Sequence, residues 1–144
     1  MSDYMADAEA LFRNFARRHS FAIIKVEEPG FDLLMRVPQQ PGLSFELTLA
    51  LQNDDEINIG LEEFWSYFFP FEEQRHAVSD ALDALATGEC RLAIHQQLGR
   101  VVKRVLERRF HGHWRPIYRD YPGIRIPFLR SKISYLYNQD ARPR

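Results

Sequence analysis

The N-terminal part of the chain changes from helical to strand periodicity. Apolar positions within residues 3–19 recur at spacings of three and four, which predicts an amphipathic helix with one buried face and with Ser2 or Asp3 as its cap. Residues 21–28 and 31–37 are then rich in β-branched and aromatic side chains and are separated by a Pro-Gly dipeptide that is typical of turns. This pattern predicts a helix followed by two strands.

The clearest strand pattern lies at residues 43–52. Leucine and phenylalanine occupy every second position there, with mainly polar side chains between them. This alternation predicts one buried face and one face that is wet or covered by polar groups. An Asn-Asp-Asp turn follows, and the alternation resumes at residues 57–61. Together these segments predict an antiparallel meander.

The middle of the chain returns to helical spacing. Pro70 is suited to the first turn of a helix, whose apolar stripe continues to about Thr87, and Gly88 is a stop signal. Residues 89–97 alternate as a strand. The segment 100–109 fits either a helix or a strand, and we favour a strand because a strand and a turn-like Leu-Gly step precede it.

The C-terminal part is rich in proline. Pro116, Pro122 and Pro127 predict that no long regular element forms there, and the pattern of residues 128–138 fits either a short strand or a helical turn. The order of elements predicts an α+β fold. We expect one antiparallel sheet of about five to six strands, packed by the N-terminal helix and by a second helix near 71–87.

Length and composition limit the class of protein. A chain of 144 residues with 45% hydrophobic side chains can bury its own core, which predicts a single domain over 1–144 and excludes a disordered chain or a fibrous repeat. The sequence contains no apolar run close to the roughly 18 residues of a membrane span and no signal-peptide pattern at its start. We therefore expect a cytoplasmic protein without a membrane partner. We expect the single cysteine, Cys90, to be a buried core residue. We also expect no metal and no cofactor.

A formal net charge of −1 conceals a strong separation of charge along the chain. Residues 1–89 hold 6 basic and 17 acidic side chains, whereas residues 90–144 hold 13 basic and 3 acidic ones. No basic residue occurs between Arg36 and Arg75. Two interpretations remain open: the two halves neutralise each other across one sheet, or their fields steer a partner. The oligomeric state is undetermined, and the acidic and basic regions of two copies could meet in a dimer.

Residues 62–73 combine aromatic and acidic side chains at high density. Six of the eight positions from 64 to 71 are aromatic, which exceeds what a short connection usually buries. Aromatic anchors within a charged rim are typical of protein-binding surfaces, although most rings could instead fill a gap between sheet and helix. We therefore expect a basic protein partner, bound without catalysis. The candidate partner-binding residues are Asp54, Asp55, Glu56, Glu62, Glu63, Trp65, Tyr67, Glu72 and Glu73.

Cations and aromatic residues alternate in the C-terminal third of the chain. Such mixtures bind nucleic acid by neutralising phosphates and stacking on bases, so nucleic-acid binding is the alternative function. We favour it less because the acidic half would repel a polyanion unless it faced away. The residues that would carry it are Arg100, Lys103, Arg104, Arg108, Arg109, Arg115 and Arg119.

His111 and His113 are two residues apart and lie close to Asp120 in the sequence. Histidines beside arginines can cleave RNA by general acid–base steps, and the three residues could ligate a metal. Zinc sites require three or four firm ligands, and the sequence does not complete such a set here. We therefore favour ordinary loop histidines over a metal or catalytic site.

The stretch DEINIGLEEFWSYFFPFEE at residues 55–73 resembles small bacterial immunity-type proteins of polymorphic toxin systems. The shared pattern is a strand with an Ile-Gly-Leu step, an aromatic turn, a helix and a β-hairpin, over about residues 43–110. The chain departs from it by carrying Glu62, Glu63, Trp65 and Tyr67 where the family would have histidines. The resemblance implies a non-enzymatic cytoplasmic protein that masks a toxin domain. A secretion-type chaperone would use similar physics, and composition does not separate the two.

Overall fold

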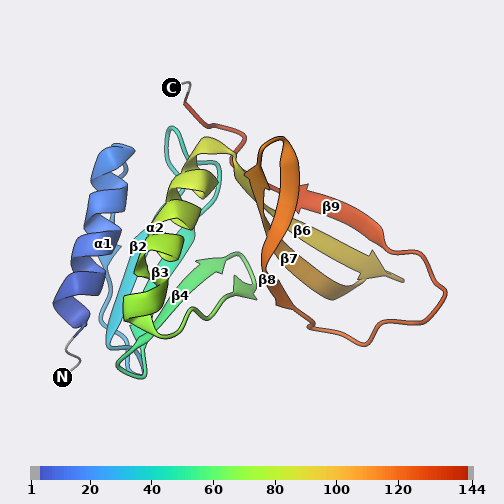
Figure 1. The fold of residues 1–144 in the computed structure, drawn as a ribbon, viewed down its shortest axis with the longest axis horizontal. Coiled ribbons are helices and arrows are strands. Elements are labelled where there is room, and N and C mark those ends of the chain that lie inside the picture. The colour runs from blue at the N-terminus through green and yellow to red at the C-terminus, as the bar shows by residue number, and fades with distance from the viewer. Residues whose placement is uncertain (1–3, 143–144) are drawn as a thin grey trace.

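Two helices and two antiparallel sheets form the protein in the computed structural model, which describes residues 4–142 (Figure 1). The helices are α1 (Met5–Arg18) and α2 (Phe71–Thr87). The first sheet has the order β1 (Ile24–Lys25), β2 (Leu33–Val37), β3 (Leu47–Gln52), β4 (Glu56–Leu61) and β5 (Phe64–Trp65). The second sheet has the order β8 (His113–Asp120), β7 (Arg100–Phe110), β6 (Cys90–Gln97) and β9 (Lys132–Leu136).

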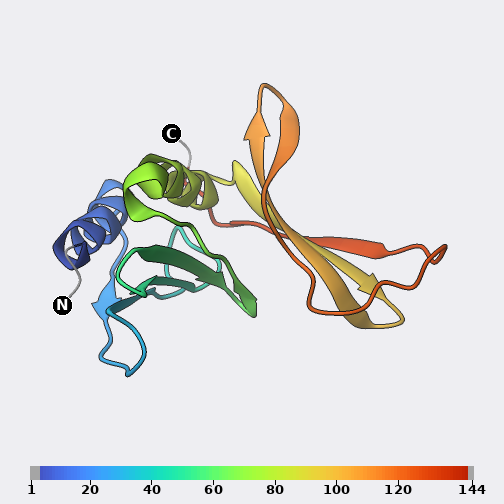
Figure 2. The ribbon, with the colours of Figure 1, turned by 60° about the horizontal axis from the view of Figure 1, so that its bottom comes forward.

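Both helices cover the same face of the first sheet and leave its other face open, as Figure 2 shows. The register places Met35, Leu49 and Ile59 side by side on the helix-covered face, where they pack in one buried cluster with residues of both helices. Positions between them point to the open face and hold small or polar residues such as Thr48 and Gly60. The alternation seen in the sequence therefore corresponds to one face packed on the helices and one that they leave uncovered, although Leu34, Ala50 and Asn58 on the second face are also buried.

The ends of α2 are set by local chemistry. Pro70 precedes the helix with an extended backbone, and the Asp55 carboxylate accepts a hydrogen bond from the Phe71 amide at 2.9 Å. Gly88 ends the helix in the left-handed conformation, with φ of 83°, where glycine avoids the steric cost of a Cβ. The start of α1 has Tyr4 at the cap position without a side-chain cap, and the caps expected from the sequence lie outside the described residues.

The second sheet packs against the β5 edge of the first sheet. Tyr118 on β8 lies with its ring centroid 5.8 Å from those of Phe64 and Phe68. Leu92 and Leu106 of the second sheet belong to the same buried cluster as the first sheet. Burial of the Tyr118 hydroxyl raises its pKa, although a backbone hydrogen bond with Tyr67 acts in the opposite direction. One continuous core thus joins the two sheets.

The α+β class and the predicted helices are confirmed, and β1 to β4 form the expected meander, to which the structure adds the unpredicted strand β5. The expectation of one sheet with five to six strands differs from the nine strands in two sheets. Strand order along a sequence does not reveal which sheet a strand joins, and here α2 intervenes before the second set begins. The segment 100–109 is a strand, as favoured, and 128–138 contains the strand β9.

Several predicted boundaries were wrong. Regular pairing at residues 21–28 is limited to the two-residue β1, and residues 43–46 lie outside β3. Pro116 does not prevent an element, because it lies within the eight-residue β8. It is tolerated because β8 is an edge strand and the β7–β8 register shifts next to the Glu107–Pro116 pair. Within residues 4–142, the structure contains no helix with the length and hydropathy of a membrane span.

Candidate protein-binding surface

Aromatic side chains of residues 64–71 alternate between the core and the surface. Phe64, Phe68 and Phe71 are buried, while Tyr67 and Phe69 expose 51% and 64% of their area and Trp65 is half-buried. The segment runs back along β4, so Trp65 pairs with Gly60 and Phe68 with Ile57. Half of the rings therefore complete the core. This agrees in part with the interpretation that most of the rings fill a gap between sheet and helix. We define the outward set Trp65, Tyr67 and Phe69 as the aromatic row.

Trp65 lies flat against the open face of the first sheet. A Cβ added to Gly60 would come within 2.8 Å of the indole ring and 3.1 Å of the Thr48 Cβ. Phe31 packs edge-to-face against the indole with centroids 6.1 Å apart. Gly60 thus provides the space that the indole occupies, and the ring, packed against Gly60 and Phe31, is half-buried.

The predicted acidic residues form two groups at opposite ends of β4. Glu62 and Glu63 lie exposed in the β4–β5 turn. The other group is Asp54, Asp55 and Glu56 with Glu72 and Glu73, because the Phe71 amide bonds to Asp55 and brings the start of α2 to the β3–β4 turn. The aromatic row runs between the two groups.

Some of the acidic side chains have hydrogen-bond or ion-pair partners within the chain, and others face solvent. Asp55 caps α2, Glu56 accepts a hydrogen bond from the Asn58 amide at 3.2 Å, and Glu72 lies 3.7 Å from Arg75. Glu62 and Glu63 line a groove of about 430 Å³ that separates their turn from the second sheet. Arg104 lines the opposite wall, but its guanidinium is bonded to Asp120 at 3.0 and 3.1 Å. The carboxylates at this end of the row therefore face solvent.

The acidic and basic halves do not neutralise each other across one sheet. The acidic half builds the first sheet and the helices, and the basic half builds the second sheet. Arg91 pairs with Glu107 and Arg104 with Asp120 within the second sheet, while Arg108 approaches Asp80 of α2 at 3.9 Å. The separation of charge in the sequence thus persists as a separation in space.

The seven basic residues of the alternative site are divided between the two faces of the second sheet. Their strand register decides this, because directly paired residues point to the same face. Arg104, Arg108 and Arg115 share the face that contacts the first sheet; Lys103, Arg109 and Arg119 share the opposite face; Arg100 begins β7. The fold therefore does not assemble these cations into one continuous strip.

The histidine pair and the cysteine have no chemistry assembled around them. His111 and His113 flank the exposed β7–β8 turn, whereas Asp120 lies at the other end of β8, bonded to Arg104. Across residues 4–142 no group of three or more His, Cys, Asp or Glu side chains could hold a metal ion. Cys90 is fully buried, and burial raises the pKa of its thiol to about 12.

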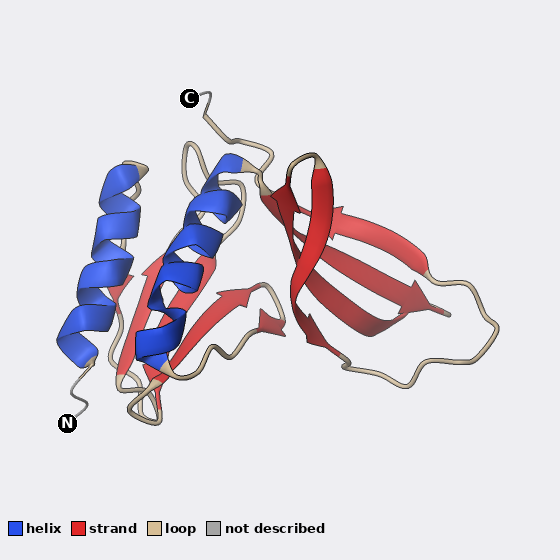
Figure 3. Cartoon of the chain, in the orientation of Figure 1, coloured by secondary structure: helices blue, strands red, loops and turns tan. Residues whose placement is uncertain are grey.

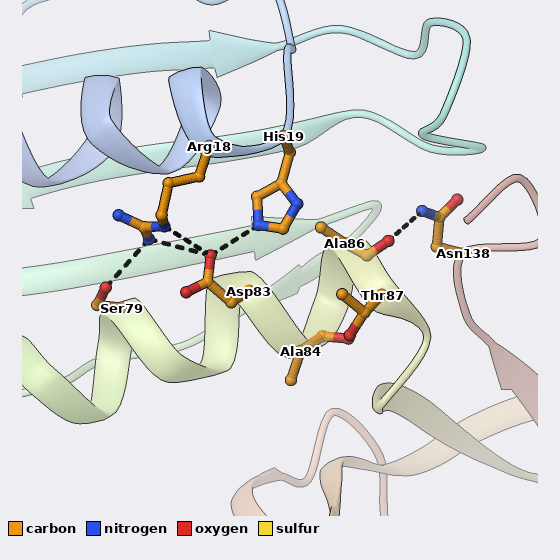
Figure 4. Close-up of polar contacts among 8 residues, drawn as sticks. All are labelled: Arg18, His19, Ser79, Asp83, Ala84, Ala86, Thr87 and Asn138. Carbon is orange, nitrogen blue, oxygen red and sulfur yellow. Dashed lines mark hydrogen bonds and ion pairs between the residues drawn. The ribbon is translucent and has the colours of Figure 1, made fainter. Parts of the chain in front are cut away.

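A polar cluster between the helices was missed by the sequence analysis (Figure 4). Asp83 on α2 accepts hydrogen bonds from the Arg18 guanidinium at 3.0 and 3.2 Å, and its Oδ1 lies 2.7 Å from His19 Nε2. Arg18 also donates to the Ser79 hydroxyl. Cations at the end of α1 interact favourably with its carboxyl-terminal dipole. The cluster ties α1 to α2, and its members lie about 65 positions apart, which no local sequence pattern signals.

Asn138 was also missed, and it anchors the chain after β9 to the helical side of the molecule. Its side chain is 3% exposed, and its amide donates to the carbonyls of Gly42 and Ala86, each at 2.7 Å. Its carbonyl oxygen accepts from the Ser44 amide at 2.9 Å. Asp140 then accepts from the Gly42 amide at 2.7 Å. These hydrogen bonds hold the C-terminal segment against the β2–β3 loop, and they thereby fix the second sheet relative to the first.

Comparison with known proteins gave no similarity on which a family assignment could rest. No family model matches the chain, and neither a curated protein nor a solved structure matches it.

Proposed function

We propose that this chain is a non-enzymatic, cytoplasmic protein-binding module whose aromatic row, with the acidic groups at its two ends, engages a basic protein partner. The observation that carries the proposal is the division within residues 64–71, where Phe64, Phe68 and Phe71 complete the core and the other three rings do not. Tyr67 and Phe69 are left over from that packing and remain largely exposed. Their exposure therefore has no explanation in the stability of the fold.

The charge of the surroundings specifies the kind of partner. Glu62 and Glu63 are exposed at one end of the row, and Glu72 and Glu73 are exposed at the other. An acidic rim of this kind accelerates encounter with a basic surface, while aromatic contacts that become buried slow its release. Rings with few rotatable bonds, such as Trp65 and Tyr67, lose little entropy on binding, which is why such residues dominate binding energies at interfaces.

A toxin domain that acts on nucleic acid would be a suitable partner, because such domains are often basic. This agrees with the resemblance of residues 43–110 to immunity-type proteins. A secretion chaperone would use the same surface on an extended segment of its substrate. The two differ in the state of the partner: an immunity protein binds a folded domain, and a chaperone binds an unfolded one.

Photo-crosslinking in the cells that express the protein tests the proposal. A benzophenone amino acid at position 67 should give an adduct with a basic protein, identified by mass spectrometry. The matched control places the same group at Glu28, which is also exposed but lies in the β1–β2 loop. The E62Q/E63Q variant should reduce the yield, whereas E27Q/E28Q removes the same charge elsewhere and should not. Equal adducts from positions 67 and 28, with folding intact by circular dichroism, would refute the proposal.

Nucleic-acid binding through the second sheet remains the alternative. Its test is a salt titration of binding to single- and double-stranded nucleic acid, since phosphate contacts are strongest at low salt. The distribution of the seven cations over both faces argues against it. Tight binding at low salt, lost in R115Q/R119Q but not in E62Q/E63Q, would favour the alternative over a protein partner.

A further inference from the structure

The far end of the second sheet carries a loop that displays apolar side chains. Residues 121–131 cross from β8 to β9 at the end of the molecule remote from both helices (Figures 1 and 3). Ile124 and Phe128 expose 92% and 108% of their area, and Ile126 and Leu129 are exposed to a lesser degree. Four exposed apolar residues within six positions form a convex tip, which we call the apolar tip.

Gln97 holds this loop in one conformation. Its side chain is almost fully buried, donates to the carbonyls of Ile126 and Leu129 at 3.3 and 2.9 Å, and accepts from the Ile126 amide at 2.7 Å. Phe128 has a φ of 67°, a left-handed conformation that costs an aromatic residue energy. A loop pinned by a buried amide thus presents Phe128 outward in a strained backbone, at no gain to the core.

Basic residues surround the apolar tip. A hollow of about 570 Å³ beside it is lined by Lys103, Arg125, Arg130 and His95, with Val102 and Ile133 as apolar floor. No acidic residue occurs between Asp120 and Asp140 in the sequence. Burial lowers the pKa of His95, and the neighbouring Lys103 and Arg125 lower it further, while Glu107 acts in the opposite direction.

We propose that this end of the protein docks on an anionic lipid surface, with Ile124 and Phe128 in the interface and a lipid phosphate in the hollow beside them. Apolar side chains that enter the headgroup region, combined with Lys and Arg that attract anionic lipids, are the two contributions on which peripheral membrane binding rests. A convex tip with few apolar residues suits a yielding lipid surface. A stable protein interface would need a broader complementary patch of about 800 Å² on each partner.

The inference goes beyond the protein-binding function and departs from the expectation that the protein has no membrane partner. That expectation rested on the absence of a spanning apolar run in the sequence. Surface docking needs no such run, because folded loops far smaller than a span can supply the contact. The tip also lies on the second sheet, away from the aromatic row of the first sheet, so the two proposals can fail independently.

Co-sedimentation of the full chain with vesicles tests the proposal. The chain should bind vesicles of phosphatidylcholine mixed with phosphatidylglycerol and should bind phosphatidylcholine alone at least about tenfold more weakly. R125Q/R130Q should weaken binding about 25-fold, taking about fivefold for each charge near the surface. I124S/F128S should also weaken it at least about tenfold, because two exposed apolar side chains no longer enter the interface. The matched control Y67S/F69S removes two exposed rings from the first sheet and should bind as the unmodified chain does.

A second measurement distinguishes lipid from a second copy of the chain. F128W should show fluorescence quenching by brominated lipid in the anionic vesicles, while the unmodified chain, which contains only the native Trp65 and Trp114, should not. Binding to anionic vesicles that survives I124S/F128S would overturn the proposal. So would the absence of vesicle binding together with a dimer in light scattering that I124S/F128S dissociates, since the tip would then dock on another copy.

Discussion

Removal of the Asn138 side chain should destabilise the whole protein, although the residue lies six positions from the C-terminus. Its amide and carbonyl satisfy the carbonyls of Gly42 and Ala86 and the amide of Ser44. Ala86 lies in the last turn of α2, where carbonyl groups have no partner within the helix. In N138A these groups lose their partner inside a region from which water is largely excluded.

The magnitude follows from the two carbonyl groups alone. A buried polar group left without a hydrogen bond costs about 1–3 kcal/mol, and Gly42 and Ala86 are both buried. We take the lower half of that range because water can partly enter the space left by the side chain, which gives a loss of about 2–4 kcal/mol in the free energy of unfolding. This is a large part of the stability of a typical small domain, about 5–15 kcal/mol.

Urea unfolding followed by circular dichroism measures the effect. The neighbouring Q139A is the matched control, because Gln139 is exposed and uses only its backbone amide, and it should change stability by less than about 0.5 kcal/mol. N138D keeps the size of the side chain but directs a carboxylate at two carbonyls. It should be at least as destabilising as N138A near neutral pH and should recover partly in acid, where the protonated group can donate one hydrogen bond.

Two outcomes would refute the reasoning on Asn138. The first is an N138A protein as stable as the Q139A control, which would mean that the C-terminal segment contributes nothing to the packing of the two sheets. The second is an N138D protein more stable than N138A at neutral pH, which would mean that the side chain does not act as a donor to Gly42 and Ala86.

Three further outcomes are expected. G88A should lower the free energy of unfolding by about 1 kcal/mol, since a Cβ is strained at a φ of 83°, whereas changing an exposed residue in the middle of α2 such as His76 to Ala should have little effect. G60A should displace Trp65, which an altered fluorescence maximum would report, and cost about 1–3 kcal/mol because the new Cβ meets the ring at 2.8 Å; an unchanged spectrum contradicts the contact. Cys90 should resist thiol reagents at pH 8 until the protein unfolds. Because its folded pKa of about 12 exceeds the ordinary value of 9.0, the unfolded state loses the proton first and stability should decrease from about pH 9 upward, an effect that C90A should abolish.

The structure decides whether the acidic and basic halves of the chain neutralise each other, which composition alone left open. Neutralisation within one sheet was an open interpretation, but the halves build different sheets and the second sheet pairs Arg91 and Arg104 with its own carboxylates. Glu62 and Glu63 therefore remain directed at solvent, and no acidic residue occurs between Asp120 and Asp140, the stretch that carries Arg125 and Arg130. The two proposals assign a partner of opposite charge to each of these regions.

The sequence by itself determined the elements whose signals are local. The spacing of Leu11, Phe12 and Phe15 predicts α1, the alternation at residues 43–52 and 57–61 predicts β3 and β4, and Pro70 with Gly88 delimits α2. These signals are reliable because periodicity and end residues act through neighbours within a few positions. For residues 64–71 the sequence left open whether the rings were buried or exposed, and the structure buries three of them while Tyr67 and Phe69 stay exposed.

Only the tertiary structure decided the features that depend on contacts between distant residues. The pairing of β6 with β9, the cluster of Arg18 and His19 with Asp83, and the anchoring of Asn138 join positions from about 40 to almost 100 residues apart. A side chain such as Gln97 reads as an ordinary polar residue in the sequence, yet it is buried because a loop 29 residues later closes over it. Burial and hydrogen-bond satisfaction are properties of the assembled chain, and they decide which apolar and charged groups are left at the surface for a partner.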